Sequence, residues 1–127
     1  MCIRDRNSTV SGNSVAGSNG NGAGMSISDS SVVIRRSVIS RNTAQTGGGG
    51  LYIESDSKTI PTTVEVREST VSQNHAIYGN EICTYRTPTI TIVNTLFNQV
   101  TNANDFYEFN GHATWYTCAT NLSLIHI

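Results

Sequence analysis

The chain alternates apolar and polar residues over short stretches that recur along its length. Three clear examples are Ser31–Arg35, Thr63–Arg67 and Thr89–Val93, each with an aliphatic residue at its second and fourth places. Alternation over so few residues, rich in β-branched side chains and bounded by Gly, Asn and Ser, predicts half-buried β-strands. No stretch predicts a helix, so the pattern indicates an all-β protein.

A nine-residue segment repeats without gaps at 34–42, 66–74 and 92–100. The first two copies share an aliphatic start, Arg at the second place, Ser at the fourth, an aliphatic residue at the sixth and Ser-x-Asn at the end. The third copy has Val100 where Asn is expected. A shorter copy at 7–13 aligns with 36–42, the last seven residues of the first copy. The repeat therefore recurs every 26–32 residues.

A second repeated element follows a glycine-rich stretch and itself begins with glycine. It occurs at 24–27 and 50–53, with a looser copy at 79–84. We expect Leu51 and Ile53 to point inward and Tyr52 outward. The run 47–50 predicts a corner rather than a phosphate loop, since no Lys and no helix follow it. Gly24 and Gly79 are expected to play the same part in neighbouring coils.

Three short strands per repeat predict a solenoid in which each coil stacks on the next and shares one apolar interior. Copies one coil apart then run parallel, and the usual crossover rule makes the winding right-handed. An antiparallel meander would not explain similar residues at one-coil spacing. The predicted fold is a right-handed single-stranded parallel β-helix of three to four coils, with boundaries near 7–36, 37–68, 69–94 and 95–121.

Asparagines end three of the repeats at the same place. We expect Asn13, Asn42 and Asn74 to stack at a corner and to hydrogen-bond along a ladder that satisfies turn backbone groups. The alternative is three unrelated exposed turn residues.

These motifs resemble those of the right-handed parallel β-helix proteins of the pectin-lyase-like superfamily. The likeness is greatest to the repeats of bacterial surface proteins and polymorphic outer-membrane proteins, which carry apolar-x-x-Asn and Gly-Gly-x-aliphatic motifs. The first motif is present at 10–13, 39–42 and 71–74, and the second at 48–51. The resemblance covers about residues 7–97 and implies an extracellular or bacterial cell-surface location. It does not fix an activity, because this fold serves lyases, hydrolases, adhesins and stalks.

Composition excludes several classes of protein. The 127 residues are 13% charged with a net charge of −1, which offers no electrostatic basis for nucleic-acid binding. No apolar run approaches 18 residues, so no membrane-spanning helix is expected. Cys2, Cys83 and Cys118 lack the spacing of a zinc site and are interpreted as small buried residues, with a Cys83–Cys118 disulfide left open.

Both ends of the chain have unusual strings. Residues 1–6, MCIRDR, and 122–127, LSLIHI, resemble translated sequencing-adapter read-through, so we set them apart from the repeat region 7–121. The absence of a visible signal peptide then carries no information about export.

Candidate chemistry is sparse. Glu54 and Asp56 form the only close acidic pair and, with Tyr52, are weak candidate surface contacts, although the sequence favours a solvated strand end for the acidic pair. Arg35 and Arg67 share register and face outward, toward either an anionic glycan or water. The histidines are interpreted as turn residues. Sugar-stacking platforms are a further hypothesis, built on Tyr52, Tyr78, Tyr85, Tyr107, Trp115 and Tyr116.

The sequence therefore favours a non-enzymatic structural or adhesive segment of a secreted or cell-surface β-helix protein, in contact with glycans and with neighbouring coils of a longer chain. The alternative is a fragment of a polysaccharide lyase or glycoside hydrolase whose catalytic coils lie outside this chain. No catalytic residue, cofactor or metal ligand is predicted.

Overall fold

The computed structural model describes residues 2–98, 104–109, 111–112 and 114–118. All the regular secondary structure in these residues is β-strand. The strands are β1 (Cys2–Arg6), β2 (Thr9–Ser11), β3 (Ser14–Val15), β4 (Met25–Ser28), β5 (Ser31–Arg35), β6 (Val38–Ser40), β7 (Thr43–Ala44), β8 (Leu51–Glu54), β9 (Thr63–Arg67), β10 (Thr70–Ser72), β11 (Ile82–Tyr85), β12 (Thr89–Val93), β13 (Leu96–Asn98), β14 (Phe106–Phe109) and β15 (Thr114–Cys118).

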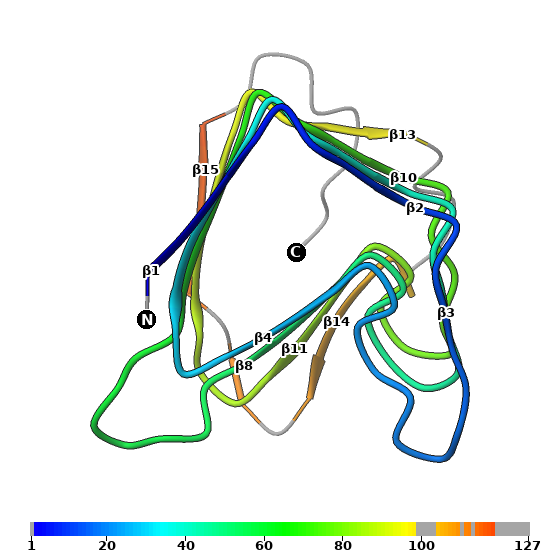
Figure 1. Ribbon diagram of the computed structural model, residues 1–127. Helices are drawn as coiled ribbons and strands as arrows, with labels where there is room; N and C mark the ends of the chain where they lie inside the picture. The colour runs from blue at the N-terminus through cyan, green and yellow to red at the C-terminus, as the bar shows by residue number, and fades with distance from the viewer. Residues whose placement is uncertain (1, 99–103, 110, 113, 119–127) are drawn as a thin grey trace.

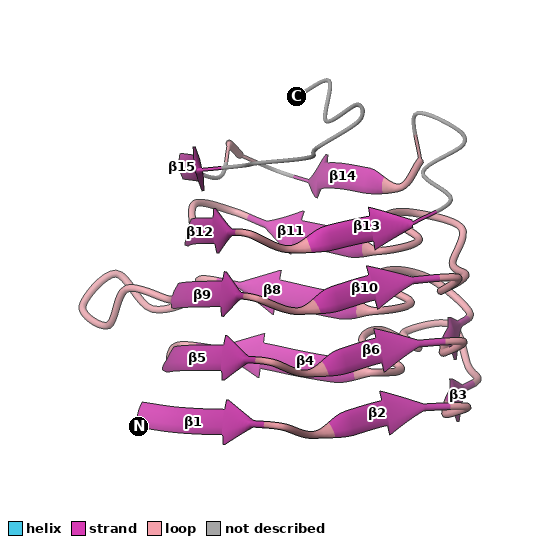
Figure 2. Ribbon diagram, turned by 90° about the horizontal axis from the view of Figure 1, so that it is seen from above, coloured by secondary structure: helices cyan, strands magenta, loops and turns pink. Residues whose placement is uncertain are grey.

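Thirteen of the strands form three parallel sheets around one interior, and β3 and β7 pair as a separate two-stranded parallel sheet at a corner (Figure 1). The β1 sheet has the order β1-β5-β9-β12-β15, the β2 sheet β2-β6-β10-β13 and the β4 sheet β4-β8-β11-β14. Each coil contributes one strand to each sheet, and successive coils stack along one axis (Figure 2). The predicted parallel β-helix with three short strands per coil is confirmed, over about three turns.

The winding is right-handed. In Figure 1 the chain runs clockwise from β1 through β2 to β4, and Figure 2 shows that successive coils lie farther from the viewpoint of Figure 1. This is the hand that the crossover rule predicts for parallel strands of one sheet.

The registers reproduce the repeats read from the sequence. Ile39 in β6 is paired with Val10 and Val71, and Val71 is paired with Phe97. In the β1 sheet, Val66 lies between Ile34 and Ile92. Every offset inferred from the nine-residue segment and its shorter copy is therefore a strand pairing.

The core consists of aliphatic columns that run from coil to coil. Leu51 and Ile53 are fully buried, as the alternation predicts. The other fully buried or nearly buried members are Ile27, Val32, Ile34, Ile39, Val64, Val66, Val71, Ile82, Ile90, Ile92 and Phe97. Each strand adds two or fewer residues to this core, so a single coil buries little and depends on its neighbours.

The glycine corners differ from the expectation in their alignment. Because Leu51 pairs with both Met25 and Ile82, Gly24 corresponds to Gly50, whereas Gly79 corresponds to Gly48. Gly48 and Gly79 adopt positive φ angles of 64° and 63°, which glycine accepts without strain. Gly24 and Gly79 therefore do not play the same part: one allows a close backbone contact and the other a left-handed turn.

Residues 2–6 continue the sheet although their side chains leave the repeat. Strand β1 pairs in register with β5, which puts Asp5 in line with Ile34. The Asp5 carboxylate accepts a hydrogen bond from the Ser8 hydroxyl. Backbone pairing thus extends the β1 sheet by one strand, while the apolar column is interrupted at Asp5.

Candidate ligand-binding groove

The three asparagines named by the repeat lie one above another at a corner that follows the β2 sheet. Asn13 donates from its backbone N and from Nδ2 to Oδ1 of Asn42, at 3.1 and 3.0 Å. Asn42 donates in the same two ways to Oδ1 of Asn74, both at 3.0 Å. The Nδ2 groups of Asn42 and Asn74 also donate to the carbonyls of Val10 and Ile39, at 3.0 Å each. The stack thus satisfies corner backbone groups within the described part of the chain.

Glu81 ends this asparagine ladder. Its carboxylate accepts from Nδ2 of Asn74 at 2.5 Å and from the backbone N of Asn74 at 3.3 Å. The register would put Val100 at the next ladder position, and that residue lies outside the described ones. A carboxylate from the following strand corner therefore supplies the acceptor that an asparagine supplies elsewhere.

Burial raises the pKa of Glu81 to about 7, and the nearby Asp105 carboxylate adds to the shift against the opposing hydrogen bonds from Asn74. Glu81 and Asp105 are both buried, at 2% exposure each. Asp105 accepts a hydrogen bond of 2.9 Å from Nδ2 of Asn80. This cluster is explained by its structural place at the end of the ladder.

The outer face of the β4 sheet carries the groove-forming side chains in two columns. One column runs through Ser26, Tyr52, Cys83 and Tyr107, and the other through Ser28, Glu54, Tyr85 and Phe109. Serines occupy both columns in β4 and aromatic rings dominate from β8 to β14. The outer face therefore becomes aromatic along the solenoid axis.

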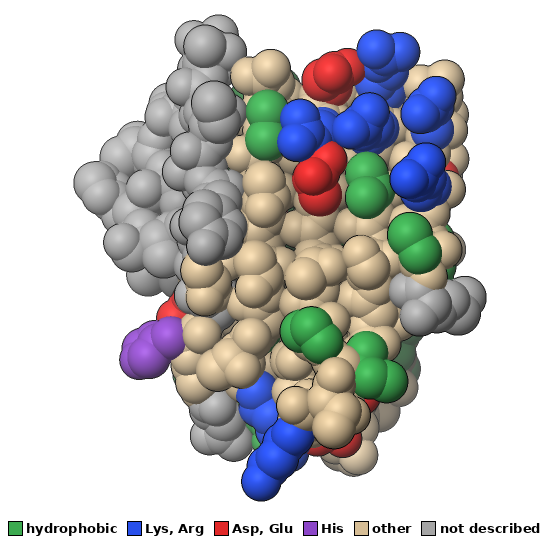
Figure 3. Space-filling view, turned by 90° about the vertical axis from the view of Figure 1, so that its left-hand side faces the viewer, with side chains coloured by type: hydrophobic (Ala, Val, Ile, Leu, Met, Phe, Trp, Pro, Cys, Tyr) green, Lys and Arg blue, Asp and Glu red, His purple; other side chains and the backbone are tan. Residues whose placement is uncertain are grey.

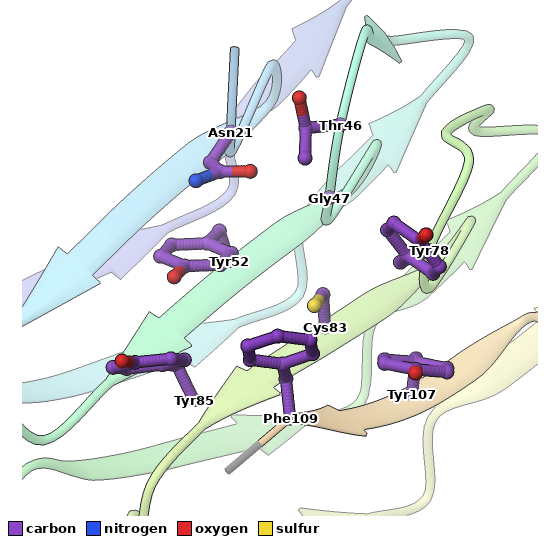
Figure 4. A pocket seen from close by; sticks show the side chains of 9 residues that line it. All are labelled: Asn21, Thr46, Gly47, Tyr52, Tyr78, Cys83, Tyr85, Tyr107 and Phe109. Carbon is purple, nitrogen blue, oxygen red and sulfur yellow. The ribbon is translucent and has the colours of Figure 1, made fainter. Parts of the chain in front are cut away.

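A groove of about 270 Å³ lies on this face (Figure 4). Its aromatic walls, which we call the aromatic groove, are Tyr52, Tyr78, Tyr85, Tyr107 and Phe109. Cys83 lies between Tyr52 and Tyr107 in its column, and neighbouring parallel strands are about 4.8 Å apart, so the two tyrosines are separated by roughly twice that distance. The small thiol side chain leaves the hollow between them.

Four of the rings form a continuous arc. The Tyr85 and Phe109 rings stack at 5.7 Å between centroids, and those of Phe109 and Tyr107 are 6.4 Å apart. Tyr107 then contacts the Tyr78 ring at 5.0 Å. Mutual packing at these distances holds the rings in place and leaves an aromatic surface toward the groove.

Polar groups border the groove at one side. Asn21 and Thr46 come from the corner that precedes the β4 sheet, where Asn21 bridges to Gly47. The Asn21 amide hydrogen-bonds to no side chain or backbone group of the described residues, whereas the Thr46 hydroxyl donates to the carbonyl of Ser18 at 3.1 Å. The groove thus offers hydrogen-bonding groups beside its rings.

The three candidate contacts from the sequence have different surroundings. Tyr52 lies in the groove, where burial and the nearby Glu54 carboxylate raise its pKa, so that the phenol is uncharged at neutral pH. Glu54 accepts a hydrogen bond from the Ser28 hydroxyl at 3.2 Å. Asp56 is outside the strand, because β8 ends at Glu54. Its carboxylate pairs with Arg86, whose guanidinium also donates to the Asp56 carbonyl at 3.0 Å.

The arginine pair predicted to face outward is on the β1 sheet. Arg35 and Arg67 are register neighbours, and both contact the Glu65 carboxylate, Arg35 at 3.5 Å. Basic and acidic side chains are intermixed on this face (Figure 3). Arg67 and Arg35 hold the pKa of Glu65 below its ordinary value by hydrogen bonding and charge attraction. The two arginines therefore share one carboxylate, that of Glu65.

The remaining candidates are dispersed. Trp115 and Tyr116 belong to β15 of the β1 sheet, on a different face from the groove, and their side chains are outside the described ones. Cys83 is a free thiol. Among the residues that the structure covers, no cluster of three His, Cys, Asp or Glu could hold a metal ion, and no helix is long and apolar enough to span a membrane.

Sequence reasoning missed Phe109 and the two polar residues, Asn21 and Thr46. Period-2 alternation from Tyr107 would have put Phe109 on the same face, had Phe106–Phe109 been identified as a strand. Asn21 and Thr46 lie in irregular corners, where no period applies.

No family model matches the chain, and neither curated proteins nor solved structures give a match. What the groove can bind therefore follows from its own side chains: flat apolar ring faces, phenol hydroxyls, the Asn21 side-chain amide and the Thr46 hydroxyl.

Proposed function

We propose that the chain is a structural and adhesive segment of a secreted or cell-surface β-helix protein, related to the pectin-lyase-like superfamily, and that its aromatic groove contacts a glycan. The supporting observation is the arc of four rings on the outer face of the β4 sheet, bordered by hydrogen-bonding groups. The proposal assigns the rest of the solenoid a scaffolding role.

The chemistry of a sugar matches such a surface. A pyranose ring has faces of C–H groups that stack on aromatic rings, and equatorial hydroxyls that require hydrogen-bond partners at its edge. Tyr, with an apolar ring and a polar tip, serves both needs. Small-molecule sites similarly combine apolar walls with a few placed polar groups.

The solenoid gives the groove a rigid base. The groove rings come from β8, β11 and β14, which are paired to each other along the axis, and from the corner that precedes β11. Side chains held by paired strands lose little conformational freedom on binding, and this favours affinity. An extended polymer could also follow the stacked coils beyond the groove.

Affinity electrophoresis of the purified chain through gels containing soluble polysaccharides tests the proposal. We expect at least one glycan to retard the chain. Phe109→Ala or Tyr78→Ala should reduce the association constant for that glycan at least fivefold. Leu96→Ala is the matched control, because Leu96 is an exposed apolar residue of the β2 sheet, at 49% exposure. Circular dichroism checks that all variants keep their strands. No retardation by any glycan, or equal loss in all three variants, would contradict the proposal.

The enzyme alternative is tested separately. A polysaccharide lyase releases unsaturated products, whose absorbance can be followed with uronate polymers as substrates. Absorbance growth that depends on this chain would replace the adhesive role by a catalytic one.

A further inference from the structure

The charge around the aromatic groove selects among glycans. Resting on the glycan-binding function proposed above, we infer that the groove takes a neutral glycan and discriminates against polyuronates and other anionic chains. The inference is carried by the arrangement of the charged side chains near the groove and on the opposite faces of the solenoid.

Glu54 is the acidic side chain closest to the ring surface along the strands. It lies two residues after Tyr52 on the same face of β8, and it is paired across the sheet with Tyr85. Its carboxylate accepts from a serine hydroxyl and forms no salt bridge with any described residue. The charge of Glu54 is also felt within the groove, because it contributes to the raised pKa of Tyr52.

Arg86, the basic residue beside the Tyr85 ring, does not compensate for Glu54. The Arg86 guanidinium lies 5.1 Å from the centroid of the Tyr85 ring. However, Arg86 is already paired with the Asp56 carboxylate and donates to the Asp56 carbonyl. The guanidinium and Asp56 together are close to neutral, so the potential at this side of the groove follows Glu54.

Apart from Lys58, which lies exposed in the loop between β8 and β9, the other basic side chains belong to other sheets or their corners. Arg4, Arg6, Arg35 and Arg67 belong to the β1 sheet, and Arg36 follows β5 at its corner, where it pairs with Glu68 at 2.8 Å. Opposite charges within about 4–6 Å are what an anionic ligand needs for a favourable contact, and charges beyond a Debye length of about 8 Å are screened at physiological salt. No basic residue is among the described residues that line the groove, so a carboxylate-bearing sugar bound there would lie near Glu54 with no cation in the groove wall.

The size of the groove points to a glycan rather than to a second copy of the chain. Nine residues line it, whereas a stable protein interface uses roughly 20–30 residues on each side. Its volume of about 270 Å³ lies just below the roughly 300–1,000 Å³ found for small-molecule sites. One or two sugar units fit such a space, with the polymer continuing over the adjacent coil surface.

Affinity electrophoresis with matched polymers tests the inference. The probes are a neutral β-glucan, xyloglucan and mannan on one side and polygalacturonate on the other, at low salt and at physiological salt. We expect at least one neutral polymer to bind the chain tenfold or more tightly than polygalacturonate does. Glu54→Lys should reduce this ratio at least fivefold. Glu68→Lys, with the same charge change on a remote corner, should leave the ratio unchanged.

The outcomes separate the two proposals. Equal or tighter binding of polygalacturonate would overturn the neutral-glycan inference and leave the glycan-binding function standing. Failure of every polymer to bind would remove the proposed function and the inference with it. Concentration-dependent dimerisation in sedimentation, abolished by Phe109→Ala, would assign the groove to contacts between copies and also overturn the inference.

Discussion

The Nδ2 amide of Asn74 donates a 2.5 Å hydrogen bond to the carboxylate of Glu81, where the asparagine ladder would otherwise run out of acceptors. Glu81 corresponds by register to Gly50 of the preceding coil. The absence of a side chain at Gly50 leaves room for the Asn74 amide. A glycine–asparagine contact is thus replaced, one coil later, by an asparagine–glutamate hydrogen bond. This exchange stabilises the corner despite the loss of the fourth asparagine.

Substitution of Asn42, the central asparagine of the ladder, should destabilise the fold more than substitution of Asn13 at its end. Asn42 is fully buried and takes part in hydrogen bonds with Asn13, Val10 and Asn74. We expect Asn42→Ala to lower the free energy of unfolding by about 3 kcal/mol or more, because each buried partner left unpaired costs about 1–3 kcal/mol. Urea unfolding followed by circular dichroism measures this.

The matched control for Asn42 is Asn13→Ala at the exposed end of the ladder. Its loss should cost about 1 kcal/mol, the usual net value of one hydrogen bond. Equal effects of the two substitutions would show that the ladder does not contribute as described.

Glu81 should make the stability of the chain depend on pH. Since its pKa is raised to about 7 from an ordinary 4.5, the folded state holds a proton that the unfolded state releases. Its stabilising contribution is therefore complete below about pH 4.5 and is lost as pH rises to about 7, by an amount of the order of 3 kcal/mol. Urea titrations between pH 4.5 and 8 should show this decline.

In Glu81→Gln the titrating group is absent, while the shape and an oxygen acceptor for Asn74 remain. The decline over this pH range should flatten. A slope that persists unchanged in this variant would mean that another group causes it.

The two kinds of corner glycine should respond differently to alanine. At Gly50 a Cβ atom would come within 2.5 Å of the Glu81 carbonyl oxygen and 2.9 Å of Nδ2 of Asn74. At Gly12 it would meet nothing within 4 Å, and only the positive φ of 69° opposes substitution. We expect Gly12→Ala to cost about 1–2 kcal/mol, the usual penalty of a left-handed residue, and Gly50→Ala to cost clearly more. Thermal melts of both variants test the order, and a reversed order would contradict the close packing at Gly50.

The corner at Gln73 can be made more stable by substitution. Gln73 has a φ of 59° and corresponds by register to Arg41 and Gly12. Asn tolerates this conformation better than Gln, so Gln73→Asn should raise stability by up to about 1 kcal/mol. Gln73→Ala, which also loses the exposed hydrogen bond from Arg41, is the comparison. A melting temperature for the Asn variant no higher than that of the Ala variant would contradict the strain at this corner.

Much of the fold was predictable because its signals are periodic. The alternation that buries Leu51 and Ile53 and the recurrence of Val10, Ile39 and Val71 depend only on local sequence and on one-coil spacing. The alignment of Gly79 was misjudged, because two glycines of the run 47–50 serve different purposes that composition does not distinguish.

The candidate site was less accessible to sequence reasoning. The groove joins rings from three strands and a corner, and its hollow depends on the small Cys83 side chain between two tyrosines. Glu81 could not be assigned to the ladder either, since it approaches Asn74 from another corner seven residues later. Such contacts depend on the three-dimensional path of the coil and do not follow from any period in the sequence.

The most direct test of glycan binding in the aromatic groove is an NMR titration of the aromatic ring and backbone amide resonances with a soluble neutral oligosaccharide. We predict saturable shifts of the Tyr52, Tyr85, Tyr107 and Phe109 rings, with Glu65 and Arg67 on the β1 sheet unaffected. Unchanged ring resonances at saturating sugar, or shifts confined to the β1 sheet, would contradict it.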